Sequence, residues 1–156
     1  MGFATHLGPW LLGTVKNTTG TTAATTRNTG CTIVSQSIAI GTSGTAATAF
    51  ALPAGAQINS IRFNCTTLYG AGTLKLSIGA TDITNTLTLP TSTTGVTDMT
   101  LGAASATAAG LINNVGSSDV LVTYTLASAT SGAGTIVITY AVRNSDGSQY
   151  PSATQN

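Results

Sequence analysis

The sequence Thr73-Leu74-Lys75-Leu76-Ser77-Ile78 alternates aliphatic residues with hydroxyl or charged residues. Successive side chains of a β-strand point to opposite faces of a sheet, so this period of two places Leu74, Leu76 and Ile78 on one face. A strand with one apolar face needs a second layer to cover that face. The stretch therefore predicts one strand of a layered β-structure.

Two later stretches, residues 119–126 and 135–142, repeat this alternation. Ser131-Gly132-Ala133-Gly134 lies between them, and its glycines can adopt the positive backbone angles that a hairpin needs. We expect these two strands to pair antiparallel as a hairpin. By the same reasoning, Gly70-Ala71-Gly72 is expected to form a hairpin turn ahead of the strand at 73–78.

Weaker alternation predicts further strands at residues 32–40, 48–52, 57–66, 82–89, 96–101 and 110–115. Residues 53–55 and 90–92 contain prolines where turns are expected, at the spacing typical of sandwiches. A short helical turn at 103–109 is a less favoured alternative for an alanine-rich segment. With about eight to ten strands, the predicted fold class is all-β, an antiparallel β-sandwich or jelly roll with an extended N-terminal arm.

The composition agrees with this fold and excludes several classes of function. Only 6% of the residues are charged, none is Glu, and the net charge is +1, whereas an average soluble domain is about 25% charged. Thr is the commonest residue and favours strands. The five basic side chains are scattered, so no basic stripe is present for nucleic acid, and no stretch is apolar enough over about 20 residues to span a membrane. Ice-binding β-solenoids share this composition, but the irregular spacing of the Thr-x-Thr pairs disfavours them.

Residues 1–30 differ from the rest of the chain. Five bulky apolar residues gather near the N-terminus: Phe3, Leu7, Trp10, Leu11 and Leu12. Residues 17–30 contain no bulky apolar side chain that could cover this cluster, and Gly8-Pro9 interrupts the pattern of a signal peptide. We therefore predict an N-terminal arm over 1–30 and a β-sandwich domain over 31–156. The five apolar residues are the predicted interface with a neighbouring subunit.

Residues that support catalysis or metal binding are few and dispersed. His6 is the only histidine and lies in the predicted arm. The four carboxylates, Asp82, Asp98, Asp119 and Asp146, belong to different strands or turns, and a chain without Glu cannot close a calcium loop of the EF-hand kind at 144–147. We expect no enzymatic activity, no cofactor and no metal.

Cysteines and aromatic residues are expected to serve packing. Cys65 follows Ile61 and Phe63 at period two, which predicts a buried reduced thiol, with a Cys31–Cys65 disulfide as the alternative. The predicted core comprises the alternating apolar residues of the best strands: Ile61, Phe63, Leu74, Leu76, Ile78, Val122, Tyr124, Ile136, Ile138 and Tyr140. Tyr69 and Tyr150 are possible contacts for a glycan, although packing is the favoured role for both.

Several stretches resemble a sequence pattern that is common in tailed-phage virion proteins. They are FALPAGAQI at 50–58, IRF at 61–63 and GAGTLKLSIG at 70–79, in which an aromatic residue and LPAGA lead into a strand, a glycine-rich turn and a second strand. The sequences LGPWLLGTVKN at 7–17 and RNTG at 27–30 resemble the starts of small structural proteins of marine phages. These patterns cover about half of the chain and consist of turns and strands.

The resemblance implies a β-sandwich or jelly-roll protein of the particle surface, such as a head decoration (cement) protein. The expected partners are the major capsid protein and other copies of the chain, in a homotrimer suited to the threefold positions of a capsid lattice. The expected location is the virion surface, after assembly in the host cytoplasm. Two alternatives remain, namely a tail-fibre or receptor-binding module that holds glycans, and an exported adhesin or pilin-like subunit.

Overall fold

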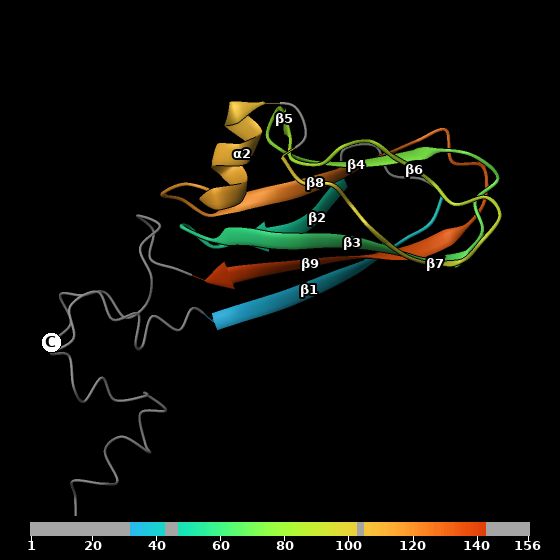
Figure 1. The fold of residues 1–156 in the computed structure, drawn as a ribbon, viewed down its shortest axis with the longest axis horizontal. Coiled ribbons are helices and arrows are strands. Elements are labelled where there is room, and N and C mark those ends of the chain that lie inside the picture. The colour runs from blue at the N-terminus through green and yellow to red at the C-terminus, as the bar shows by residue number, and fades with distance from the viewer. Residues whose placement is uncertain (1–31, 43–46, 103–104, 143–156) are drawn as a thin grey trace, which may run out of the picture.

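Two antiparallel sheets pack face to face in the computed structural model, which describes residues 32–42, 47–102 and 105–142 (Figure 1). Sheet A contains, in spatial order, β1 (Thr32–Ile40), β9 (Ala133–Val142), β3 (Gln57–Thr67) and β7 (Gly95–Asp98). Sheet B contains β2 (Ala47–Leu52), β8 (Val120–Ala127), β4 (Thr73–Ile78) and β5 (Thr81–Asp82), and β6 (Leu87–Thr88) also pairs with β4.

The chain crosses between the sheets at every connection except those that join β4, β5 and β6. β1, β3, β7 and β9 lie in sheet A, whereas β2, β4, β5, β6 and β8 lie in sheet B, and every pairing is antiparallel. This alternation gives the strand order of a jelly roll, in which two sheets share one core. The predicted all-β sandwich is therefore confirmed, and the described residues do not form a solenoid.

The predicted hairpin between the last two strands is wrong. β8 belongs to sheet B and β9 to sheet A, so residues 128–132 carry the chain across the core. Two strands with apolar faces can bury them side by side or face to face, and alternation alone does not distinguish the two arrangements. A five-residue connection is long enough to bridge the spacing of about 10 Å between packed sheets. Gly70-Ala71-Gly72 likewise joins β3 to β4 across the sheets and is not a hairpin turn.

The predicted strand at 110–115 is also wrong, because most of it belongs to a helix, α2 (Ala106–Asn113). The Ser105 hydroxyl accepts a hydrogen bond from the Ala108 backbone N–H at 3.1 Å and caps the first turn. Ala108 is buried, and Leu111 and Ile112, three and four residues later, are half-buried on the same helical face. Figure 1 shows α2 at one end of the sandwich, where it packs against β3 and β5.

The predicted strand at 82–89 is divided in the structure. β5 and β6 both pair with β4, and Thr84 between them forms an isolated bridge with Leu101. The buried Thr84 hydroxyl accepts a hydrogen bond from the Leu76 backbone N–H at 3.0 Å. The Thr84 hydroxyl thus takes the place of a backbone carbonyl for the Leu76 N–H, while the Ile83 backbone N–H still donates to the Leu76 carbonyl at 2.9 Å.

The predicted core is confirmed, because all ten of its residues are buried between the sheets. Phe63 lies at its centre, with its ring centroid 6.0 Å from that of Tyr69. Ser77 was expected on the solvent face of β4 but is only 9% exposed, because its hydroxyl donates a hydrogen bond to Asp82 at 2.7 Å. The register of β4 is as predicted, since Leu74, Leu76 and Ile78 face the core.

Candidate interaction surface

Several residues singled out by the sequence lie outside the described part of the chain. These are the five predicted interface residues, Phe3, Leu7, Trp10, Leu11 and Leu12, together with His6, Cys31, Asp146 and Tyr150. The proposed division into an arm and a domain also falls there, because the described sandwich begins at Thr32. Their roles remain predictions.

Each of the three described carboxylates makes a local contact with a neighbouring element. Asp98 on β7 forms an ion pair with Arg62 on β3, with 2.7 Å between Oδ1 and Nε. Asp119 accepts a hydrogen bond from the Ala54 backbone N–H at 2.9 Å, which ties the start of β8 to the turn after β2. These contacts join neighbouring elements, so the carboxylates act here as structural links.

Asp82 is the most connected of the three carboxylates. Its Oδ1 accepts from the Ser77 hydroxyl at 2.7 Å and its Oδ2 from the Lys75 ammonium at 2.9 Å. The hydrogen bond from Ser77 and then that from Lys75 lower the pKa of Asp82 below its ordinary value. On the outer face of sheet B, this cluster of side chains links β5 to its neighbour β4.

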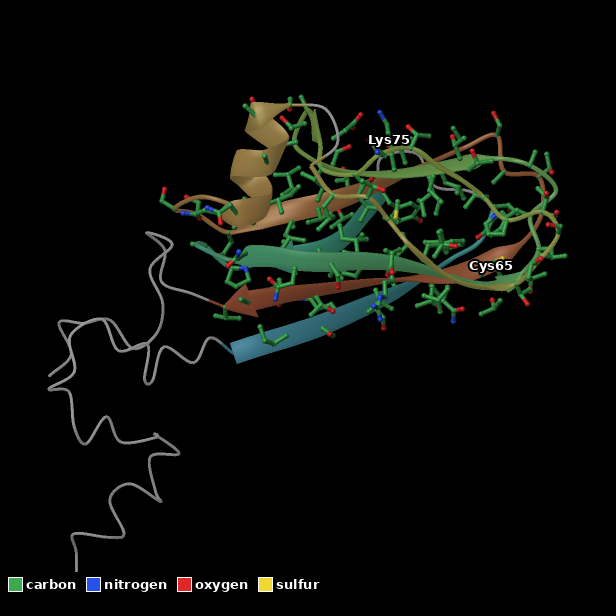
Figure 2. The ribbon with its side chains drawn as sticks, in the orientation of Figure 1. Cys65 and Lys75 are labelled. Carbon is green, nitrogen blue, oxygen red and sulfur yellow. The ribbon has the colours of Figure 1, made fainter. Side chains whose placement is uncertain are left out.

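Cys65 occupies the position expected of a packing residue. It is buried on β3, is not part of a disulfide, and its thiol donates to the Thr67 carbonyl at 3.3 Å (Figure 2). The prediction of a reduced core thiol is therefore confirmed over the disulfide with Cys31.

Tyr69 is also a core residue. It is 1% exposed, and its hydroxyl donates to the Gly41 carbonyl at 3.2 Å, while burial raises the pKa of its phenol above the ordinary value. A Cβ on Gly132 would lie 2.5 Å from the Tyr69 ring, so only glycine allows the chain to pass there. Packing is thus the role of Tyr69, which cannot stack on a glycan.

The outer face of sheet A is a regular surface built from four strands. Side chains that pair directly across strands share a face, and the pairings place on this surface Ile33, Ser35, Ser37, Ala39, Thr135, Val137, Thr139, Ser60, Arg62, Asn64, Val96 and Asp98. Most of them are small or carry a hydroxyl group, and the two charged residues neutralise each other. The result is a nearly uncharged face built of four strands.

The sequence reasoning missed this surface because it considered residues singly. Alternation separates the polar positions of each predicted strand from its apolar face, but it does not give the order in which the strands lie beside one another. The register Ser37↔Val137↔Arg62↔Asp98 runs across all four strands of sheet A. Long-range pairing therefore creates the surface.

Exposed apolar side chains are scattered over the described residues. They are Ile33 at 57%, Leu68 at 37%, Val96 at 64% and Leu121 at 56% exposure. Ile33 and Val96 lie on the outermost strands of sheet A, whereas Leu121 is on β8 in sheet B. Single exposed apolar residues are normal on protein surfaces and do not by themselves define a site.

Among the described residues, no group of three or more His, Cys, Asp or Glu side chains is arranged to hold a metal ion. Within the same residues, no helix has the length and apolar character to cross a membrane. The comparisons of the chain with protein-family models, curated proteins and solved structures gave no match in any of the three.

Proposed function

We propose that the chain is a non-enzymatic structural protein of a phage particle. In this proposal it decorates the capsid surface, binds the major capsid protein and assembles with copies of itself, as a homotrimer at the threefold positions of the lattice. The N-terminal residues Phe3, Leu7, Trp10, Leu11 and Leu12 anchor it to a neighbouring subunit or to the shell beneath.

The outer face of sheet A is the observation that carries this proposal. Its Ser, Thr, Ala and Val side chains are short, so ordering them against a partner costs little conformational entropy. Arg62 and Asp98 form an ion pair, so their charges cancel and this surface carries no net charge. Such a face suits repeated contact with a fixed, flat protein surface.

Two further features support a structural role. The described carboxylates Asp82, Asp98 and Asp119 all bind neighbouring parts of the fold. The jelly-roll strand order is found in viral capsid domains and also in lectins. Because fold alone does not determine function, this likeness only favours the class of protein. The burial of Tyr69 removes one of the two aromatic contacts expected for glycan binding.

Antibodies against the purified chain would test the proposal by immunogold labelling of phage particles from the source culture. Labels over the head are expected for a decoration protein. Labels at the tail would favour the fibre alternative, and particles without label would contradict both.

The anchor can be tested separately with Trp10→Ala and with a chain that lacks residues 1–12. Loss of a buried aromatic anchor costs about 2 kcal/mol or more of binding, so both variants should co-sediment poorly with particles. Circular dichroism should show an intact β-domain. Full occupancy on particles would show that the segment is dispensable, and unfolding would show that it belongs to the domain's own core.

A further inference from the structure

β1 is an unusual edge strand. Within the described residues it pairs on one side only, with β9, through nine successive residue pairs without a register shift. It contains no proline and no glycine, and the sequence from residue 28 to residue 61 has no charged side chain. A long regular edge of this kind exposes a row of backbone donors and acceptors that another strand can use.

The other described edges are protected. β7 has four residues and carries Asp98, and β5 has two residues and carries Asp82. β2 has a register shift against β8, and its Ala51 carbonyl accepts a hydrogen bond from the Gln36 side chain at 3.1 Å. Short length, charge and irregularity are devices that prevent unwanted strand pairing, and β1 has none of them.

The core is also incompletely covered beside β1. Val34 and Ile38 pack against the core but are only half-buried, whereas Ile136 and Ile138 on the adjoining β9 are fully buried. This difference follows from position, because β1 has no neighbour on its outer side among the residues that the structure describes. A strand added beside β1 would cover both residues.

We infer that β1 pairs antiparallel with β1 of a second copy, so that the two A sheets become one continuous sheet. Full overlap of two nine-residue strands places the twofold axis at Gln36, the middle residue of Thr32–Ile40. Val34 of one copy then faces Ile38 of the other on the core side. Ser35 faces Ser37 of the other copy on the outer side.

This register makes the edge complementary to itself. Val34 meets Ile38, Ile33 meets Ala39, Ser35 meets Ser37 and Gln36 meets Gln36, so the central pairs match in kind, and no charge is buried. A second copy is therefore favoured over a charged or dissimilar partner. The contact uses the edge of sheet A, so it leaves the outer face free and does not depend on the proposed function. Because it is twofold, it joins two copies in pairs, or two of the proposed homotrimers where these form.

This register can be tested by introducing charged side chains at two exposed positions of β1, Ser35 and Ser37. In Ser35→Lys/Ser37→Lys, two pairs of like charges would face each other across the axis, whereas Ser35→Lys/Ser37→Asp would place opposite charges there. The mass of the full chain is measured by analytical ultracentrifugation over a range of concentrations, at low salt and with a reductant. We expect the first variant to weaken association at least tenfold and halve the mass, and the second to retain the wild-type mass.

Thr86→Lys/Thr91→Lys is the matched control, because it adds the same charge at exposed positions away from sheet A. It should keep the wild-type mass, and circular dichroism should show that every variant is folded. A wild-type chain that is monomeric at all concentrations would overturn the inference. So would a trimer that neither edge variant alters, or an equal loss of mass in the control. Because particle labelling is not involved, failure here is distinct from failure of the proposed function.

Discussion

β9 and β1 lie side by side in sheet A and have the same kind of sequence, yet they stand in different environments. Both alternate aliphatic residues with small or hydroxyl residues. β9 lies between β1 and β3, and its Ile136 is fully buried, whereas Ile38, its direct partner on β1, is half-buried. Position in the sheet, and not the alternation itself, determines how much apolar surface each strand buries.

The strand between two neighbours should be the more sensitive to truncation. Ile138→Ala on β9 and Phe63→Ala on β3 should each lower the free energy of unfolding by about 2 to 5 kcal/mol, because both residues are 0% exposed and would leave cavities. Urea denaturation followed by circular dichroism measures the change. A loss below about 1 kcal/mol for both variants would contradict the packed core described here.

Glycines give a second contrast between the two strands. A Cβ on Gly134 in β9 would lie 2.4 Å from the Phe63 ring and 2.7 Å from the Asn64 carbonyl oxygen, whereas a Cβ on Gly41, just after β1, meets no atom within 4 Å. Gly134→Ala should therefore cost about 1 to 3 kcal/mol of stability through overpacking. Gly41→Ala should be neutral or stabilising by up to about 1 kcal/mol. Equal effects in the same denaturation assay would contradict the difference in packing.

The half-buried edge residue should give a smaller effect that depends on concentration. Ile38→Ala should cost about 1 kcal/mol in dilute protein, less than Ile136→Ala, because part of its side chain is already in water. If β1 pairs with a second copy, the cost should grow with protein concentration, because association stabilises the folded state. A cost that equals that of Ile136→Ala at high dilution would show that β1 is covered within one chain.

The alternation in sequence predicted strands and their buried faces well, because a period of two depends only on neighbours along the chain. The core positions from Ile61 to Tyr140 were identified in this way. The partner of each strand was not, since β8 and β9 were expected to pair but face each other across the core. The helix at 106–113 overlaps the less favoured helical turn at 103–109, but its extent was not predicted, because its apolar face includes Ala108, whose small side chain gives little signal of amphipathicity.

The surface was harder to predict than the core for the same reason. Ser35, Val137 and Arg62 belong to three strands that are distant in sequence, and only sheet order places them on one face. No single motif marks such a surface. The exposed edge of β1 likewise follows from its place at the end of the order β1-β9-β3-β7.

The smallest expected effect tests the contrast between a charged edge and an uncharged one. Asp82 on the β5 edge has a lowered pKa, so the folded state favours its ionised form, and this stabilisation is present above the ordinary pKa and lost as the pH falls through the lowered value. Because the Asp82 side chain is about half exposed, we expect its ionised form to contribute only a few tenths of a kcal/mol to the free energy of unfolding. In Asp82→Asn, the free energy of unfolding should therefore fall slightly less steeply as the pH drops below 4. Ser77→Ala, which removes the largest cause of the shift, should act in the same direction. Urea titrations from pH 7 to about pH 2.5 measure both slopes. If neither variant changes the acid slope, the Ser77–Asp82–Lys75 cluster does not fasten this edge, and the charged and uncharged edges do not differ in their response to acid.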